Sequence, residues 1–319
     1  MKILAIRLAR FGDIVLLLPA LTFLKAQFPK STLSFVTDQR WAPLAEMCPA
    51  IDEIIAIDRL GMRDGSLGHG MRGVLRVGRE VRSRRFDAVV DFHGFRETSL
   101  IAWWSRAPRR MGLKRFDQPY WDWCFNLPPV MEDKAVHVSE MFFRVARGFV
   151  QADGSGNPCG PALVIPAVAK EWGAKNLPTT PYVAMFVDGP VKERMWPLER
   201  FRQVANHIVE RWKCPVVVLA GKDSGWQNSR DVIALSGLSI AQLAQSIGAA
   251  QMLISNDTGP MHLGPALGVP TLGIFSVGYP QHFRPAGIHD LVVQGNPIDE
   301  VKLEQVIEAA DRLRLTSAR

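Results

Sequence analysis

Short apolar runs alternate with segments of helical spacing along the whole chain, and this alternation constrains the fold more than any other feature of the sequence. The expected strands of the first half cover residues 2–8, 32–36, 54–57 and 86–91, and those of the second half cover residues 182–187, 215–220, 251–255, 271–275 and 291–293. Buried strands that alternate with helices pair in parallel, with both faces of the sheet covered. The sequence therefore predicts an α/β protein.

The segments between these strands have apolar residues at helical spacing, and the expected helices cover residues 14–27, 41–47, 72–84, 198–211, 240–247, 261–267 and 303–313. Glycines at positions 61, 65, 68, 70 and 73 predict a mobile loop over residues 61–73. That loop carries Arg63 and Arg72.

The alternating pattern restarts after a stretch rich in Gly and Pro between residues 153 and 181. A chain of 319 residues is long for one core and suits two domains. We therefore expect two doubly wound, Rossmann-like domains that face a central cleft, over residues 1–165 and 166–319. The last helix is expected to pack back on the first domain.

Positive charge is concentrated in one part of the chain. The formal net charge is +7, and residues 59–115 hold 14 Lys and Arg against 5 Asp and Glu. Such a field attracts anionic partners, among which phosphorylated lipid, nucleic acid and nucleotide all remain open at this point. The alternative is a solvated basic face.

The apolar runs and the cysteines indicate the cellular compartment of the protein. No apolar run approaches the length of about 18 residues that crosses a bilayer, and Arg7 and Arg10 interrupt any signal peptide core. The cysteines, at positions 48, 124, 159 and 214, lack the spacing of a zinc site or a disulfide framework. These features predict a cytoplasmic protein with reduced thiols.

Arg10-Phe-Gly-Asp13 stands where the first strand ends and the first helix begins. Ligands of open α/β sheets bind at this edge. Asp13 is therefore either a helix N-cap or a carboxylate that faces the ligand as a general base.

The stretch from Ser255 to His262 follows another apolar strand and opens a helix. Thr258 suits the N-cap, and the free N–H groups of the next turn form an anion site. Asp257 can accept hydrogen bonds from two sugar hydroxyls. The alternative is an Asx turn with a plain helix cap.

Lys192 and Arg194 follow the strand over residues 182–187 and precede Trp196-Pro197. Arginine matches the geometry of phosphate through two parallel hydrogen bonds. No cluster of carboxylates suggests a metal ion, so cations and a helix terminus are expected to stabilise a leaving diphosphate. A surface charge without function is the alternative for these two residues.

The motifs resemble those of the bacterial ADP-heptose:lipopolysaccharide heptosyltransferases, which have the GT-B fold. The resemblance runs nearly end to end and includes Arg7 to Asp13, Leu18 to Leu21, His137 to Glu140, Arg194 to Phe201 and, most specifically, Ser255 to Pro270. It implies an inverting glycosyltransferase with an acceptor domain followed by a donor domain. A nucleotide-diphosphate sugar is then a substrate, and neither a cofactor nor a metal ion is implied.

By this resemblance Asp13 matches the catalytic base, and the donor site contains Lys192, Arg194, Asp257, Thr258, Gly259 and His262. The acceptor is expected to be an anionic glycolipid, namely a lipopolysaccharide inner core or a related anionic glycan. Residues expected to bind it are Arg10, Arg63, Arg72, Arg109, Arg110 and Arg115. The protein would then work at the cytoplasmic face of the inner membrane, in peripheral contact with it, and would bind no nucleic acid.

Three departures from the family pattern concern the donor. Arg194 stands where many relatives have a lysine, Gly264-Pro265 replaces a pair of small residues, and Ser276 to Pro280 replaces a Gly-Pro turn. A GT-B transferase with another nucleotide sugar is one alternative. A non-catalytic binder of sugar nucleotides or nucleic acid is a second, and a dehydrogenase is disfavoured because no GxGxxG follows the first strand.

Tryptophans flank part of the basic region, at positions 103, 104, 121 and 123. Core packing is the expected role for them. Contact with a membrane interface or stacking on sugars is the alternative.

Overall fold

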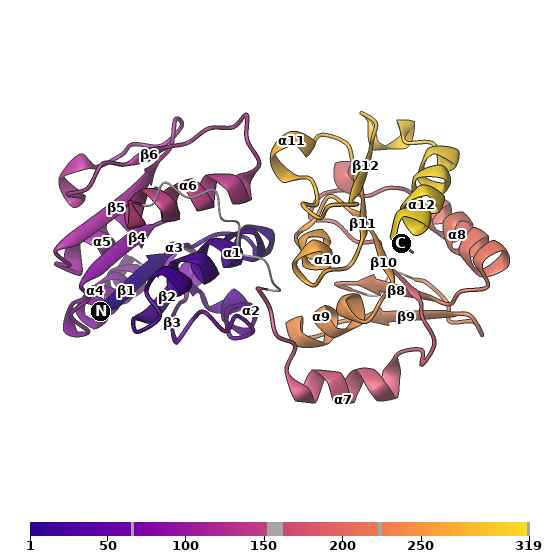
Figure 1. Cartoon of the computed structure of the whole chain (residues 1–319), viewed down its shortest axis with the longest axis horizontal. Coiled ribbons are helices and arrows are strands. Elements are labelled where there is room, and N and C mark those ends of the chain that lie inside the picture. The colour runs from indigo at the N-terminus through magenta and orange to yellow at the C-terminus, as the bar shows by residue number, and fades with distance from the viewer. Residues whose placement is uncertain (65–66, 152–161, 223–224, 318–319) are drawn as a thin grey trace. The chain divides into compact units, whose positions relative to one another are not determined.

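The computed structural model describes residues 1–64, 67–151, 162–222 and 225–317, without side chains for residues 62–72, 74 and 317. The chain divides into two compact units, Met1–Ala162 and Leu163–Arg319. The sequence had suggested residue 165 as the last of the first domain. Each unit is built around a parallel sheet of six strands (Figure 1).

The sheet of the first unit has the strand order β3-β2-β1-β4-β5-β6. Its strands are β1 (Lys2–Ile6), β2 (Thr32–Asp38), β3 (Glu53–Ile57), β4 (Ala88–Asp91), β5 (Arg109–Lys114) and β6 (Val130–Met131), and every neighbouring pair is parallel. From β1 the chain moves toward β3, and from β4 it moves the other way, toward β6. Because crossovers are right-handed, this reversal puts helices on both faces of the sheet.

The helices of the first unit are α1 (Phe11–Gln27), α2 (Ala42–Ala45), α3 (Arg59–Asp64), α4 (Leu67–Ser83), α5 (Arg96–Trp104) and α6 (Val138–Val150). α1 packs against α6, and α4 packs against α5. β1, β2, β4 and β5 bury their apolar side chains, as do the inner faces of α1 and α6. This burial is the main stabilising contribution to the unit.

The expected loop over residues 61–73 is wrong, because the described residues of this stretch belong to α3 and α4. Glycine in a helix costs only about 1 kcal/mol relative to alanine, and packing outweighs this cost. α4 buries Val77 and Val81 in the core. Gly78 brings the helix against the ring of Trp104, which a Cβ atom at that position would meet at 2.8 Å.

The second unit repeats the design with the order β12-β11-β10-β7-β8-β9. Its strands are β7 (Val183–Phe186), β8 (Val216–Ala220), β9 (Val232–Ser236), β10 (Met252–Asn256), β11 (Thr271–Phe275) and β12 (Leu291–Gln294), again all parallel. The order reverses between β7 and β10, as it does between β1 and β4 in the first unit.

The helices of the second unit are α7 (Ala167–Asn176), α8 (Leu198–His207), α9 (Ile240–Gly248), α10 (Leu263–Ala266), α11 (Pro280–Phe283) and α12 (Leu303–Ser317). The last helix packs against α8, β11 and β12 of its own unit. The expectation that it also packs back on the first domain stays a prediction. Asp311 of α12 accepts hydrogen bonds from Trp212 at 2.8 Å and pairs with His207 at 3.2 Å.

The helix predicted over residues 261–267 is shorter than expected. A 3-10 turn, η5 (Gly259–His262), is followed by the single turn of α10. Pro265 cannot donate a backbone hydrogen bond, and Gly264 lies so close to β11 that a Cβ atom there would meet Oγ1 of Thr271. One turn carries only a small dipole, so any anion site here depends on free N–H groups.

Candidate functional site

Four polar side chains follow neighbouring strands of the first sheet at their carboxyl ends. Arg7 comes directly after β1, His93 two residues after β4, Arg115 directly after β5 and Glu132 directly after β6. Arg7, His93 and Glu132 are buried, and Arg115 is half-buried. Doubly wound sheets bind ligands where the strand order reverses, which is between β1 and β4 in this unit.

Asp13 lies beside this row, in the first turn of α1. Arg10 occupies the N-cap position, so the N-cap alternative for Asp13 is wrong. One carboxylate oxygen of Asp13 accepts a hydrogen bond from the Arg10 backbone N–H at 3.4 Å, and the other pairs with Nη2 of Arg7 at 2.9 Å. The side chain keeps 22% of its surface exposed, so its carboxylate can still meet a ligand.

Arg7 determines how Asp13 is held. Its Nη1 donates to the backbone carbonyl of Phe92 at 2.6 Å, and its guanidinium lies over the ring of Phe142 at 4.8 Å. Burial lowers the pKa of Arg7, and the charge of Asp13 opposes this effect. Because the carbonyl of Phe92 and the ring of Phe142 hold this buried guanidinium, it restricts the position of the Asp13 carboxylate. A general base requires such preorganisation.

The turn between β4 and α5 is organised by Asp91. Its carboxylate accepts hydrogen bonds from the backbone N–H groups of His93 (2.8 Å) and Gly94 (3.3 Å) and from the hydroxyl of Thr98 (2.8 Å). Burial raises the pKa of Asp91 to about 6, although these hydrogen bonds act in the opposite direction. Gly94 has φ +72°, and a Cβ atom there would meet the carbonyl oxygen of Leu113. The three hydrogen bonds hold this turn together, and they fix the backbone of His93.

In the second unit Asp257 lies one residue beyond β10, at the corresponding reversal of strand order. It is 4% exposed, and its carboxylate pairs with Nη1 of Arg194 at 3.1 Å. Burial raises the pKa of Asp257, and the charge of Arg194 lowers it. The remaining N–H groups of Arg194 can bind a phosphate while the pair persists, because a guanidinium has five of them.

Thr258 and Gly259 come next, where η5 begins. Thr258 occupies the N-cap position, but its hydroxyl makes no capping hydrogen bond and is buried without a partner among the described residues. The first N–H groups of such a turn have no partner inside it. His262, which ends η5, is 5% exposed. The structure thus brings Arg194, Asp257, Thr258 and Gly259 together.

Lys192 begins the short turn that ends at Arg194, and it lines a separate cavity. The 3-10 turn η3 (Lys192–Arg194) connects β7 to α8. A cavity of about 420 Å³ opens there, lined by residues that include Asp188, Lys192, Trp196 and Lys222. Its volume is in the range of pockets for small ligands, and two lysines make it suitable for an anionic one.

Two polar residues that sequence reasoning missed hold these loops in place. The side-chain oxygen of Asn256 accepts a hydrogen bond from the backbone N–H of Trp196 at 3.0 Å, and its amide nitrogen donates to the carbonyl of Val187 at 2.8 Å. The hydroxyl of Ser276 donates to the carbonyl of Glu193. The loops after β7, β10 and β11 are therefore tied to one another.

Comparisons with known proteins show the family of the chain. Residues 74–306 match the family model of glycosyltransferase family 9 (heptosyltransferase). The chain belongs to this glycosyltransferase family.

Among curated relatives, a putative glycosyltransferase of Haemophilus influenzae is 25% identical over 86% of this chain and 82% of its own length. Lipopolysaccharide heptosyltransferase 1 of Pseudomonas aeruginosa is 23% identical over 86% of this chain and 78% of its own length.

Among solved structures, the family 9 glycosyl transferase of Veillonella parvula is 25% identical and has a TM-score of 0.82, covering 99% of this chain and 97% of its own. The Escherichia coli heptosyltransferase WaaC with ADP, at 19% identity, has a TM-score of 0.80 over 99% of this chain and 100% of its own. The fold of this glycosyltransferase is therefore GT-B.

Two of the arginines expected to bind the acceptor lie far from Asp13 in the glycosyltransferase. Arg109 and Arg110 begin β5, at the amino end of the first sheet, whereas Asp13 lies near the carboxyl end of β1. Arg109 donates to the carbonyl of Phe149, and Arg110 donates to the carbonyls of Cys124 and Ala107. Arg10 and Arg115 stand at the carboxyl end. The side chains of Arg63 and Arg72 lie outside the described residues.

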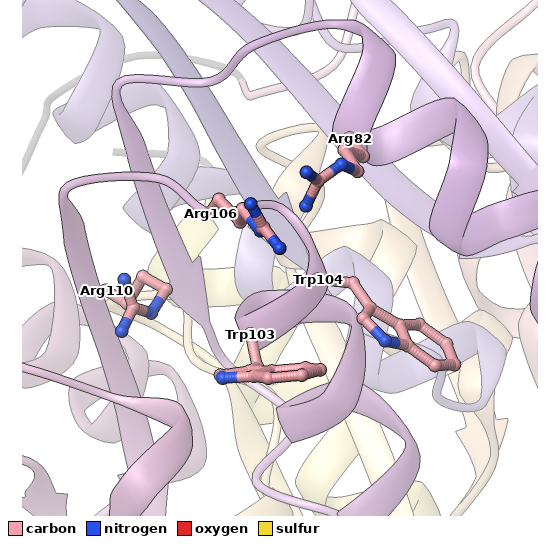
Figure 2. Close-up of a pocket in the computed structure, with 5 residues that line it drawn as sticks. All are labelled: Arg82, Trp103, Trp104, Arg106 and Arg110. Carbon is pink, nitrogen blue, oxygen red and sulfur yellow. The ribbon is translucent and has the colours of Figure 1, made fainter.

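At this amino end the first unit has a basic and aromatic pocket of about 440 Å³, lined by Arg82, Trp103, Trp104, Arg106 and Arg110. Figure 2 shows these side chains around one space, on α4, α5, the turn after α5 and β5. Trp103 is 43% exposed and Trp123 57%, and their rings lie 5.4 Å apart. Core packing was the wrong prediction for these two tryptophans.

Two further findings concern membranes and metals. Among the described residues, every helix is too short or too polar to cross a membrane. Within the same part of the chain, no group of three or more His, Cys, Asp and Glu side chains is placed to hold a metal ion.

Proposed function

We propose that this glycosyltransferase transfers a heptose from ADP-heptose to the inner core of a lipopolysaccharide or a related anionic glycan, with inversion at the anomeric carbon. The observation that carries the proposal is the pairing of Asp13 with the buried Arg7 at the switch point of the first sheet. The names of the curated relatives support the transfer of a heptose and the lipopolysaccharide acceptor, and the name of the solved Escherichia coli ADP-heptose heptosyltransferase II supports ADP-heptose as the donor.

In the proposed mechanism Asp13 removes the proton of the acceptor hydroxyl as its oxygen attacks the anomeric carbon. Asp13 suits this role because its carboxylate is fixed by Arg7 on one side and partly exposed on the other. The leaving ADP departs from the opposite face of the sugar, which inverts the configuration. General base catalysis of this kind accelerates a reaction by a factor of about 10²–10⁴.

The second unit would bind the donor. Arg194 and the backbone N–H groups of Thr258 and Gly259 would hold the diphosphate, with Asp257 and His262 orienting the sugar or a phosphate. The cavity beside Lys192 would take the nucleoside, since its volume of about 420 Å³ suits a group of that size. Because these residues supply the charge that a leaving diphosphate needs, we propose that the reaction requires neither a metal ion nor a cofactor.

Arg10 and Arg115 would bind anionic groups of the acceptor close to Asp13. The basic and aromatic pocket at the amino end of the first sheet would instead face the lipid, since tryptophan and arginine together favour anionic membrane interfaces. Arg109 and Arg110 belong to this end, and Arg63 and Arg72 are assigned to the acceptor on their charge alone. We therefore propose peripheral contact with the cytoplasmic face of the inner membrane, and no nucleic acid partner.

A transfer assay tests the proposed function. The purified protein is incubated with deacylated, heptose-free lipopolysaccharide core and with ADP-heptose, UDP-glucose or GDP-mannose, in the presence of EDTA. We expect a product heavier by one heptose from ADP-heptose alone, and NMR should show the anomeric configuration opposite to that of the donor. Equal or faster transfer from another nucleotide sugar would contradict the proposed donor.

A further inference from the structure

A group of buried polar atoms without partners lies at the carboxyl edge of the first sheet. Among the described residues, no hydrogen bond partner is present for either ring nitrogen of His93, for Nε of Arg7 and of Arg115, or for Oε2 of Glu132. Folded proteins satisfy nearly all such atoms, because each one left unpaired costs free energy. Several in one place point to a polar ligand.

The four residues lie close together along neighbouring strands. Arg7 binds the carbonyl of Phe92, which directly precedes His93. The ring centroids of His93 and Phe95 are 4.2 Å apart. The guanidinium of Arg115 lies over the ring of Phe95, 5.4 Å from its centroid.

The far end of the row is an ion pair. Arg115 pairs with Glu132 at 3.2 Å, and Glu132 is 5% exposed. The row therefore runs from Asp13 through Arg7, His93 and Arg115 to Glu132.

His93 is the unusual member of this row. It is 4% exposed, and the hydrogen bonds of Asp91 to the surrounding turn fix its backbone. Burial, together with the charges of Arg7, Arg59 and Arg115, holds the pKa of His93 well below its usual value. Its ring is therefore neutral at pH 7, with one nitrogen to donate a hydrogen bond and one to accept.

A sugar ring matches this combination of groups. Each of its hydroxyls both donates and accepts a hydrogen bond, and its C–H faces pack on aromatic rings such as that of Phe95. The neutral imidazole can bond a hydroxyl in either direction, Glu132 can accept from one, and Arg115 can donate to an oxygen or a carboxylate. Anionic groups alone would not require the neutral ring or the unpaired oxygen of Glu132.

We propose that His93, with the Arg115–Glu132 pair beside it, binds the acceptor sugar and positions the attacking hydroxyl at Asp13. This inference rests on the proposed function, because it assigns the acceptor to the first unit. His93 is a positioning residue and not a second base, since Asp13 takes the proton. Binding of the sugar would give the unpaired atoms of this row their partners.

The test compares His93→Phe and His93→Gln with the wild-type enzyme. His93→Phe keeps a ring beside Phe95 and removes both hydrogen bonds, whereas His93→Gln keeps one donor and one acceptor. Thr37→Val is the matched control, because it also removes a buried polar atom without a partner among the described residues of the same unit. The measurements are acceptor KM and kcat with deacylated, heptose-free lipopolysaccharide core, calorimetric binding of the same acceptor, ADP binding and melting temperature.

We expect His93→Phe to raise the acceptor KM and the calorimetric Kd about tenfold, as the loss of one or two neutral hydrogen bonds would, and to leave ADP binding unchanged. His93→Gln should recover part of the affinity, and Thr37→Val should match the wild type. An unchanged acceptor affinity in His93→Phe would overturn the inference, as would an equal loss in Thr37→Val.

The calorimetric measurement separates the two proposals. If the wild-type enzyme binds the acceptor but does not transfer heptose to it, the proposed function fails, while a weaker Kd in His93→Phe still supports the sugar site. If the wild-type enzyme binds no acceptor at all, the sugar site is overturned. Should His93→Phe prove unstable, the comparison of His93→Gln with Thr37→Val decides in the same way.

Discussion

The two sheets of this glycosyltransferase have the same strand count and the same kind of reversal, but the carboxyl edges differ in how far their polar groups are satisfied. In the second unit Asn256 and Ser276 bind the neighbouring loops, and Asp257 has its partner in Arg194, although the hydroxyl of Thr258 has no partner among the described residues. In the first unit His93 and Glu132 keep buried atoms without partners among the described residues. We infer that the second edge is built as a preformed anion site, whereas the first edge is completed by its ligand.

This comparison assigns chemistry to the first edge and donor binding to the second, and Asp13→Asn tests it with the largest expected effect. The variant keeps the shape of the side chain and removes the base, so kcat should fall about 10³-fold while the Kd for ADP stays unchanged. Steady-state transfer and calorimetry measure the two quantities. Asp117→Asn, an exposed acid of the same unit, is the control. Near-normal turnover in Asp13→Asn would show that Asp13 only supports its helix.

Arg194→Ala tests the second edge and should weaken ADP binding about 30-fold, because the diphosphate loses a charged hydrogen bond. The change also leaves Asp257 buried without its cation, so part of the loss comes from that carboxylate. Calorimetry measures the affinity, with Arg202→Ala as the control on the exposed face of α8. If Arg194→Ala binds ADP like the wild type, the donor site lies elsewhere.

The Asp91 turn of the first edge gives a pH dependence of stability. The pKa of the Asp91 carboxyl is about 6 in the folded protein, above the usual value near 4. As the pH rises, the unfolded chain therefore loses the proton of this carboxyl before the folded protein does. The free energy of unfolding should therefore fall by about 2 kcal/mol between pH 4 and pH 6 relative to the neutral variant Asp91→Asn. Urea unfolding at several pH values measures the difference. If the free energy of unfolding changes with pH in the same way for the two proteins, the pKa of Asp91 is not raised in the folded state.

Gly264→Ala probes the close packing of the second edge and should have the smallest effect. The added Cβ would meet Oγ1 of Thr271, so we expect a loss of about 1.5 kcal/mol in the free energy of unfolding. The double variant Gly264→Ala with Thr271→Ala removes the clash and should recover part of the loss. If the single variant is as stable as the wild type, the contact between α10 and β11 is looser than described.

The strand pattern was predicted well from the sequence because buried parallel strands leave continuous apolar runs. The prediction missed β5, β6 and β9. β5 begins with Arg109 and Arg110, and β6 has only two residues. It placed a loop over α3 and the first residues of α4, because glycines dominate the local pattern there. The rest of α4, which packs Val77 and Val81 into the core, was expected as a helix over residues 72–84.

For the candidate site, the motifs around Asp13 and Asp257 predicted where polar groups gather. They did not identify Arg7 or Asn256 as the residues that hold them. Arg7 is itself fixed by the carbonyl of Phe92, and Asn256 binds the backbone of Trp196, and both of these contacts join distant parts of the chain. His93 had only one local signal, the polar sequence after the buried strand β4. Among the described residues, the ring nitrogens of His93 are unpaired because of how the residues after β1, β4, β5 and β6 are arranged. The sequence alone does not predict that arrangement.

A crystal structure of the protein with ADP bound tests the assignment of the two edges most directly. The account predicts the diphosphate at Arg194 and the N–H groups of Thr258 and Gly259, with the nucleoside in the cavity beside Lys192. ADP bound instead at Arg7 and His93, with the edge around Asp257 empty, would contradict it.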